Sequence, residues 1–330
     1  MSPESFPALV LSSKNESLPA LQSLCLDQLP DGEVVIRVNW SSLNYKDALA
    51  ATGHPGVVRN FPHVPGLDAA GVVVASEVDE FHNGQEVLVT GYELGSFTWG
   101  GWSHFIRVPA AWVIPLPEAL TQRAAMEIGT AGFTAAMCLQ QLERNGLKPE
   151  AGAVVVTGAT GGVGCQAVQL LSRQGYHVVA STGKADAVEW LKSLGAREVV
   201  GRDIFEAPVD RPLGSARWGG AIDTVGGRTL VNLLRETQPF GCVAACGVVG
   251  GADLDLTVHP FILRGILLSG VSASLCPRPR RDQIWERLAD SWRPTKLDDV
   301  TRTVSMSELI VEIRRMLAGQ IRGRIVIDQR

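Results

Sequence analysis

The sequence has no excess of basic residues, no long apolar run and no paired cysteine motif. Its formal net charge is −4 at pH 7, so the positive footprint of a nucleic-acid-binding protein is missing. No apolar run approaches membrane-spanning length, and the N-terminus has no basic stretch followed by apolar residues, so we expect no signal peptide. The six cysteines include no C-x-x-C pair and are expected to be buried free thiols. These absences predict a cytoplasmic protein with no nucleic-acid or membrane partner.

A glycine-rich stretch at residues 153–164 is the clearest functional signal. Residues 154–156 form an apolar β-branched run typical of a buried parallel strand, and apolar residues at helical spacing follow the glycines. Ala159, Gly161 and Gly164 form a variant of the dinucleotide-binding fingerprint. A helix that begins there directs unpaired N–H groups at a pyrophosphate. We therefore expect cofactor contacts at Thr160, Gly161, Gly162 and Val163. The alternative is a glycine-rich loop that binds nothing.

The end of the second strand lacks the acidic residue that marks an NAD site. Such a site usually places Asp or Glu about 20 residues past the first glycine, where the carboxylate holds the ribose 2′-OH. This chain has hydroxyl residues and a lysine there, and an arginine follows the next expected strand. Cations can neutralise a 2′-phosphate, so the pattern predicts NADPH as the cofactor. The predicted contacts are Ser181, Thr182, Gly183, Lys184 and Arg202. The alternative for the two cations is ordinary solvated surface charge.

Two kinds of pattern divide the 330 residues, which suffice for two domains. Residues up to about 117 hold many short strands with turn signals between them, which indicates a barrel-like β domain. Residues 121–141 show helical periodicity, with Thr121 as a candidate N-cap. From residue 151, strands and helices alternate as in a doubly wound parallel sheet, at 153–157, 164–174, 177–181, 184–194, 198–200, 219–225, 227–237, 241–246 and 265–271. A helix is expected at 307–317, and a final strand at 321–327 is expected to return to the first domain.

Several motifs together resemble the medium-chain dehydrogenase/reductase superfamily. They are WSSLNYKD at 40–47, RNFP at 59–62, PGLDAAG at 65–71, IGTAGFTA at 128–135, GGVG at 161–164, AIDTVG at 221–226 and PFILR at 260–264. Within the superfamily they are similar to the acrylyl-CoA reductase (NADPH) group of the zinc-independent, quinone oxidoreductase-like branch. The resemblance implies an α/β fold with a Rossmann doubly wound parallel sheet at 121–299. It also implies a GroES-like, barrel-like β domain, made of 1–120 and 300–330. Further cofactor contacts are implied at Tyr45, Val248, Ile262 and Arg324.

The metal ligands of the zinc-dependent members of this superfamily are missing. Those members need a Cys, a His-Glu pair and a further Cys or Asp for the catalytic metal, and four cysteines for a structural one. Here Asn44-Tyr45 and Leu67-Asp68 stand at the first two of these positions, and no cysteine lies between Cys25 and Cys138. We therefore expect no metal site.

Without a metal, transfer of a hydride and a proton to a polarised double bond fits best. The resemblance implies reduction of the 2,3 double bond of a short enoyl-CoA, most specifically acrylyl-CoA to propionyl-CoA. The catalytic candidates are Tyr45 beside the nicotinamide ribose, Asn44 as an amide donor and Asp47 as a loop anchor. The alternative is that Asn44 and Asp47 only hold a turn through side-chain-to-backbone bonds. An NADPH:quinone oxidoreductase and a non-catalytic NADPH-binding protein remain alternative functions.

Two further expectations concern the substrate and the assembly. A CoA thioester carries phosphates far from its reacting carbon, and binding them positions the acyl end. The candidate cations are Arg59, Arg264 and Arg324, each of which could instead be a surface arginine without a ligand. The apolar strand expected at 265–271 would be an exposed sheet edge in a monomer. We therefore expect a homodimer built on this strand, unless residues 277–292 cover it within one chain.

Overall fold

The computed structural model describes residues 5–208 and 211–330 and divides the chain into two compact units. The first unit consists of Met1–Thr130, Ala273–Ala289 and Leu297–Arg330, and the second of Ala131–Ser272 and Asp290–Lys296. The first unit therefore extends past residue 120, where the predicted GroES-like domain ends. It also takes in residues 273–289, which the sequence patterns assign to the Rossmann domain.

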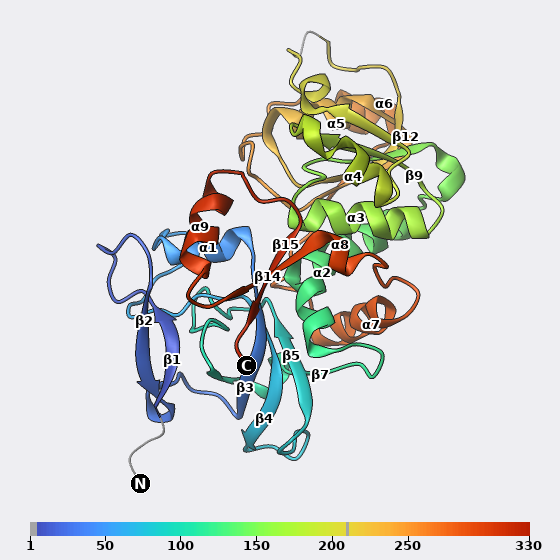
Figure 1. Cartoon of the computed structure of the whole chain (residues 1–330). Coiled ribbons are helices and arrows are strands. Elements are labelled where there is room, and N and C mark those ends of the chain that lie inside the picture. Colours follow the sequence, from blue (N-terminus) through green and yellow to red (C-terminus); the bar gives the residue numbers. More distant parts are fainter. Residues whose placement is uncertain (1–4, 209–210) are drawn as a thin grey trace. The chain divides into compact units, whose positions relative to one another are not determined.

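Alternating apolar residues build the main sheet of the first unit. In the described residues its strands lie in the order β14-β15-β3-β4-β5-β7, and β6 pairs with β3 (Figure 1). Along β3, the side chains of Val34, Ile36 and Val38 enter a hydrophobic core, whereas Arg37 between them is exposed. The strands are β3 (Val34–Leu43), β4 (Asp68–Ser76), β5 (Glu86–Thr90), β6 (Phe105–Val108), β7 (Ile114–Pro115), β14 (Thr301–Ser305) and β15 (Arg324–Asp328); β1 (Ser5–Val10) and β2 (Ala20–Cys25) pair separately.

The predicted return of the last strand to the first unit is confirmed. β15 pairs antiparallel with β3, with Ile325 opposite Leu43 and Asp328 opposite Trp40. It begins at Arg324 rather than at residue 321, because Gly323 turns the chain at φ 75° against the Val300 carbonyl. The helices of this unit are α1 (Tyr45–Ala51), α7 (Arg278–Ala289), α8 (Leu297–Val300) and α9 (Leu309–Leu317).

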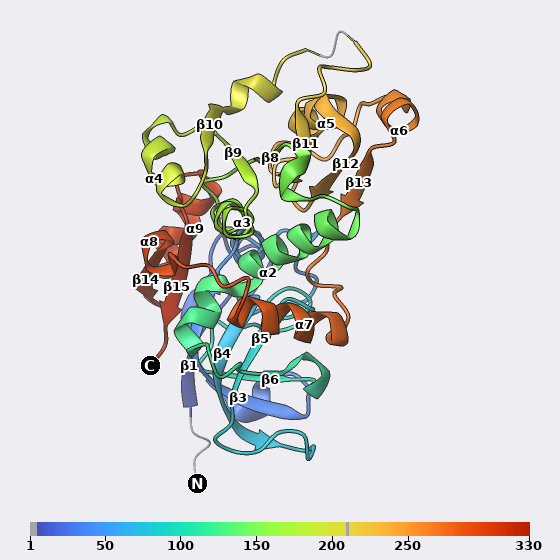
Figure 2. The same cartoon turned by 90° about the vertical axis from the view of Figure 1, so that its right-hand side faces the viewer.

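The second unit contains the predicted parallel sheet. Its strands lie in the order β10-β9-β8-β11-β12-β13, and every neighbouring pair is parallel (Figure 2). The strands are β8 (Ala153–Val156), β9 (His177–Thr182), β10 (Glu198–Gly201), β11 (Trp218–Asp223), β12 (Thr237–Ala245) and β13 (Leu267–Gly270). The helices between them are α3 (Gly162–Arg173), α4 (Val188–Ser193), α5 (Gly227–Glu236) and α6 (His259–Arg264).

Two differences from the predicted boundaries in the second unit have a cause in the local backbone conformation. The helix expected at 184–194 is shorter, because a single 3-10 turn, Ala185–Ala187, precedes α4. The strand expected at 265–271 begins at Leu267, because Gly265 adopts a left-handed conformation at φ 59° that ends α6.

Helix α2 (Gln122–Arg144) begins as predicted but is interrupted in the middle. The Thr121 hydroxyl accepts a hydrogen bond from the Ala124 N–H at 3.1 Å, which confirms the N-cap. Gly129, at φ 51° and ψ −163°, breaks the helical path at the place where the first unit ends. The periodicity gives no sign of this break. Among the described residues, no helix is both long and apolar enough to cross a membrane.

Candidate active site

The start of α1 is held by a buried carboxylate. Asp47 accepts hydrogen bonds from the Asn44 backbone N–H at 2.7 Å and from the Asn44 side-chain amide at 3.0 Å. Its other oxygen accepts from the Leu67 N–H at 2.7 Å. Burial, together with the nearby Asp68 carboxylate, raises the pKa of Asp47 to about 7. These bonds support the turn-holding alternative for Asn44 and Asp47.

The Asn44 amide is fully engaged with protein groups. Its Nδ2 donates to Asp68 at 2.9 Å as well as to Asp47, and an amide nitrogen carries two hydrogens. Its Oδ1 accepts from the Arg324 guanidinium at 2.8 Å. In this arrangement Asn44 has no N–H left for a substrate oxygen. Its role as an amide donor therefore requires these bonds to rearrange.

Asp68 is the residue that the sequence reasoning missed as a member of the site. This fully buried side chain at the start of β4 accepts hydrogen bonds from the Ser42 hydroxyl at 2.6 Å, the Asn44 amide at 2.9 Å, the Thr130 hydroxyl at 2.6 Å and the Thr130 N–H at 3.0 Å. The sequence signal that could have revealed it is an aspartate at the start of an otherwise largely apolar strand. Because Asp is rarely buried without partners, such a residue indicates a bonded carboxylate.

Arg324 lies inside the first unit rather than at its surface. Its side chain is only 2% exposed and is 3.7 Å from the Asp68 carboxylate. The guanidinium donates to the carbonyls of Met126 at 3.2 Å and Glu127 at 3.1 Å, besides Asn44. This burial contradicts the expected placement of Arg324 among solvent-facing cations for CoA phosphates.

The remaining candidates of the first unit are exposed. Tyr45, the first residue of α1, is 45% exposed, as a side chain that meets a ligand must be. Arg59 is exposed and lies over the ring of Phe97, 4.5 Å from its centroid. Both therefore remain candidates for ligand contact.

Arg264 has a structural role that the sequence did not indicate. Its guanidinium donates to the backbone carbonyls of Arg235 at 2.8 Å and Thr237 at 3.1 Å, and to that of Gly214. An arginine that satisfies three carbonyls in this way is already committed to the protein. The structure therefore speaks against Arg264 as a free cation for a CoA phosphate.

In the second unit, the glycine loop follows β8 as predicted. Gly158 has φ 54°, and a Cβ there would lie 2.3 Å from the Thr224 hydroxyl. A Cβ at Gly164 would lie 2.4 Å from the Gly158 carbonyl, so this turn closes only around glycine. Gly161 is the N-cap of α3, and residues 161–163 are partly exposed there. The loop thus presents the start of an α-helix to an anionic group.

A buried network joins the loop after β8 to the loop after β11. The Asp223 carboxylate accepts from the Thr157 hydroxyl at 2.7 Å and from the Gly226 N–H at 2.8 Å. The Thr157 hydroxyl in turn accepts from the Thr224 N–H at 3.0 Å. Burial raises the pKa of Asp223, while these donors favour its charged form. Asp223 therefore fixes two neighbouring loops at the carboxyl edge of the sheet.

The predicted 2′-phosphate residues lie together at the ends of β9 and β10. Pairing of Gly201 with Thr182 places Arg202 beside Gly183, where a Cβ would lie 3.1 Å from Arg202 Cδ. Thr182 Oγ1 accepts from the Lys184 N–H at 3.1 Å and lies 3.4 Å from Thr160 Oγ1. Ser181 and Thr182 are buried, whereas Arg202 is 71% exposed and paired with Glu206 at 3.3 Å. Val248 and Ile262, in the same unit, are 66% and 74% exposed.

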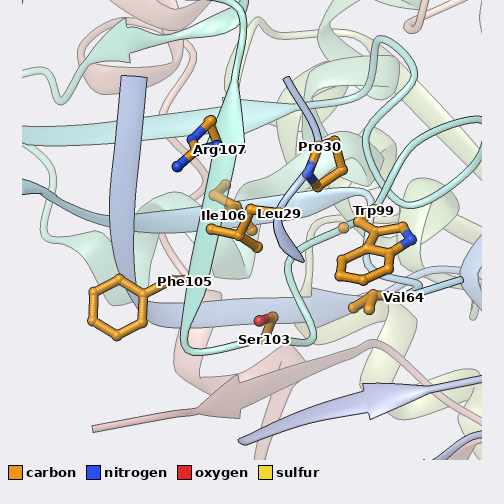
Figure 3. A pocket seen from close by; sticks show the side chains of 9 residues that line it. Leu29, Pro30, Val64, Trp99, Ser103, Phe105, Ile106 and Arg107 are labelled. Carbon is orange, nitrogen blue, oxygen red and sulfur yellow. The ribbon is translucent and has the colours of Figure 1, made fainter. Parts of the chain in front are cut away.

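Neither a metal-ligand cluster nor the pocket of the first unit in Figure 3 adds to this site in the described residues. Among the described residues, no group of three or more His, Cys, Asp or Glu side chains could hold a metal ion. Figure 3 shows a pocket of the first unit lined mainly by apolar side chains, including Leu29, Val64, Trp99 and Ile106. None of the predicted site residues lines it.

Comparisons with known proteins cover nearly the whole chain. The family model "Alcohol dehydrogenase GroES-like domain" matches residues 30–118, and "Zinc-binding dehydrogenase" matches residues 162–290. The chain is 46% identical to the probable acrylyl-CoA reductase AcuI of Escherichia coli K12, over 97% of this chain and 98% of that protein. It is 44% identical to the putative quinone oxidoreductase YhfP of Bacillus subtilis, over 93% of each. The crystal structure of E. coli K-12 YhdH with bound NADPH is similar with a TM-score of 0.94 and 45% identity, covering 99% of this chain and 100% of that one.

The Asp47 carboxyl predicts a pH-dependent stability. Its pKa is about 7 in the folded protein and ~3.9 in an unfolded chain. Between these values the folded state holds a proton that the unfolded state has released, so the free energy of unfolding falls as the pH rises and is constant above this window. Between pH 5 and pH 8, we expect the wild-type value to fall by ~2–3 kcal/mol relative to that of Asp47→Asn in urea titrations. A difference that stays constant across this range would contradict the assignment.

Proposed function

Because the chain belongs to the medium-chain dehydrogenase/reductase superfamily, in its quinone oxidoreductase-like branch, we propose that it catalyses NADPH-dependent reduction of the 2,3 double bond of a short enoyl-CoA, most specifically acrylyl-CoA to propionyl-CoA. The near-full-length likeness to an acrylyl-CoA reductase carries the substrate half of this proposal. The placement of Arg202 beside Gly183, next to the hydroxyl residues Ser181 and Thr182 at the end of β9, supports the cofactor half.

The residues of the two units divide the work. When bound, NADPH supplies a hydride for the β-carbon of the enoyl thioester, while a proton adds to the α-carbon. The glycine loop and the start of α3 hold the pyrophosphate, and Thr182, Lys184 and Arg202 hold the 2′-phosphate. Tyr45 contacts the nicotinamide ribose from the first unit. Val248 and Ile262, which the resemblance implies as further contacts, are both exposed and would supply apolar contacts for the cofactor.

The donor set does not fit a zinc ion, although one matching family model is named for zinc binding. The only acidic side chain at the former ligand positions, Asp68, already accepts bonds from Ser42, Asn44 and Thr130. Asn44 and Leu67 offer neither a thiolate nor an imidazole. We therefore propose a reaction that does not depend on zinc.

The free cysteines and the net charge of the chain are consistent with a cytoplasmic protein that has no nucleic-acid partner. All six cysteines are free in the structure, as suits a reducing compartment. The net charge of −4 provides no general attraction for nucleic acid.

Cofactor choice is tested by removing the proposed phosphate cations. Arg202→Ala and Lys184→Ala should each weaken NADPH binding by roughly tenfold or more and leave NADH binding nearly unchanged, since each removes a charge-assisted bond to the 2′-phosphate. Lys192→Ala, which removes an exposed lysine of the same unit, is the matched control. Fluorescence titration with both cofactors measures the effect. Equal affinity of the wild type for NADPH and NADH would refute the assignment.

Substrate class is tested by following NADPH oxidation with acrylyl-CoA, crotonyl-CoA and a quinone in the presence of a chelator. We expect the highest kcat/KM with acrylyl-CoA. Arg59→Ala should raise KM for acrylyl-CoA several-fold and leave turnover of a small unphosphorylated enone unchanged, whereas Arg37→Ala, which removes another exposed arginine of the first unit, should alter neither. Preference for the quinone would favour the oxidoreductase that the B. subtilis relative is named for. NADPH binding without turnover of any acceptor would favour a non-catalytic role.

The open edge of the second unit supports a homodimer. In the described residues β13 has a neighbour only in β12, and Leu267 of β13 is 44% exposed. Phe240 of β12 is 81% exposed, and its ring lies against Gly265. Such an apolar edge favours pairing with a second copy.

Sedimentation at micromolar concentration should therefore give a dimer, and Leu267→Lys should shift it toward monomer because a charge then stands at the paired edge. Leu21→Lys, at another exposed leucine, is the control. A wild-type monomer would contradict the dimer and favour cover of the edge within one chain.

A further inference from the structure

The break in α2 creates two helix ends within the first unit. A side chain of opposite charge lies at each of these ends. In an unbroken helix, the Thr130 N–H would donate to the Met126 carbonyl. Here the Met126 and Glu127 carbonyls accept from the Arg324 guanidinium, at 3.2 Å and 3.1 Å. A cation at a helix C-terminus is favoured by the helix dipole.

The opposite end is capped by Asp68. The Thr130 N–H donates to both carboxylate oxygens at 3.0 Å, and the Thr130 hydroxyl donates to Oδ1 at 2.6 Å. A carboxylate at the first N–H of a helical segment satisfies an otherwise unpaired donor. The two caps are also an ion pair, with Arg324 Nη2 3.7 Å from Asp68 Oδ2.

Gly129 leaves room for this ion pair to close. A Cβ at this position would lie 2.5 Å from Arg324 Nη2 and 2.6 Å from Asp68 Oδ2. Its φ of 51° is also one that other residues rarely adopt. We call Asp68, Gly129 and Arg324 together the helix-break lock. The lock lies entirely within the first unit.

The same two charged side chains hold the start of α1. Arg324 donates to Asn44 Oδ1 at 2.8 Å, and Asn44 donates to Asp68 at 2.9 Å. Asn44 is the N-cap of α1, and Tyr45 is its first residue. The carboxamide of Asn44 therefore couples the helix-break lock to the backbone that carries Tyr45.

We propose that the helix-break lock positions Tyr45 for hydride transfer, so that Asp68, Gly129 and Arg324 are positioning residues and Arg324 is not a phosphate ligand. This inference rests on the proposed function, in which Tyr45 contacts the cofactor. It assigns Arg324 a different role from the one expected from sequence, because its donors are committed to carbonyls and side chains of the protein.

Gly129→Ala is the decisive variant, because it removes no group that could touch a ligand. Gly146→Ala is the matched control: Gly146, which lies just after the end of α2, also has a positive φ, but a Cβ there meets nothing within 4 Å. We expect Gly129→Ala, Asp68→Asn and Arg324→Gln each to lower kcat at least tenfold while the Kd for NADPH changes less than about threefold. Glu312→Gln, at another buried carboxylate of the first unit paired with arginines, should keep kcat near wild type.

Combining two lock variants should cost no more kcat than one of them alone, since both release the same arrangement. The proposal is overturned if Gly129→Ala keeps wild-type kcat, or if Gly146→Ala loses as much. It is also overturned if Arg324→Gln weakens NADPH binding far more than the other lock variants. Should Gly129→Ala not fold, Thr130→Val removes the hydroxyl bond to Asp68 and keeps the backbone N–H bond, so it should lower kcat by a smaller factor. If both Thr130→Val and Asp68→Asn keep the wild-type kcat, the proposal is also overturned.

Failure of the proposed function has a separate signature, namely a wild type that turns over none of the acceptors. The lock is then tested by hydrogen exchange. Asp68→Asn should speed exchange at Thr130 and at the first amides of α1 together, and Glu312→Gln should not. Faster exchange at Thr130 alone would separate the helix break from α1 and overturn the coupling.

Discussion

A buried carboxylate must find its partners within the protein, and Asp68 draws them from three separate parts of the chain. Ser42 and Asn44, at the end of β3 and the start of α1, and Thr130 of α2 donate hydrogen bonds to it, and Arg324 of β15 forms an ion pair with it. Removing one partner of such a group is costly because the remaining charge stays buried without compensation. The geometry of the candidate site in the first unit therefore depends on this one side chain keeping all its partners.

The same requirement explains the neighbouring carboxyl group. Asp47 is as deeply buried as Asp68, but among the described residues no arginine is bonded to it, and its donors are the Asn44 and Leu67 groups. Its burial and the nearby Asp68 carboxylate both raise the pKa of Asp47, so that this carboxyl group holds its proton to a higher pH than an ordinary aspartic acid. In the second unit, Asp223 solves a similar problem with the Thr157 hydroxyl and the Gly226 N–H, and thereby fixes two loops. Both units use buried carboxylates to give irregular backbone a single conformation.

Local signals predicted the second unit well. The strand before the glycines, the glycine turn and the missing acid at the end of β9 are each contained in a few consecutive residues, and the alternation of strands and helices predicts a parallel sheet. The place of Arg202 was also predictable, because register in a parallel sheet brings the ends of neighbouring strands together. The role of Asn44 and Asp47 in holding the start of α1 could also be predicted as an alternative, because the two residues are only three positions apart in the sequence.

The arginines and the helix break could not be predicted in this way. In sequence, Arg264 and Arg324 look like surface cations, and only the folded chain reveals the carbonyls that each one satisfies. Gly129 stands within a stretch of helical periodicity, where a single glycine is normally tolerated. Its positive φ becomes necessary only once Asp68 and Arg324 have met beside it, and their meeting is a matter of tertiary structure.

The position of Arg324 along the chain has a consequence for biosynthesis. Asn44 and Arg324 are separated by 280 residues, and the whole of the second unit is synthesised between them. Domains generally fold in the order in which the ribosome releases them. Asp47 and Asp68, which are buried in the folded protein, are therefore synthesised long before Arg324. During that interval the parallel sheet of the second unit is synthesised and can fold. Completion of the site therefore has to follow synthesis of the second unit, and a chain that stops short of β15 would leave the Asp68 carboxylate without its arginine.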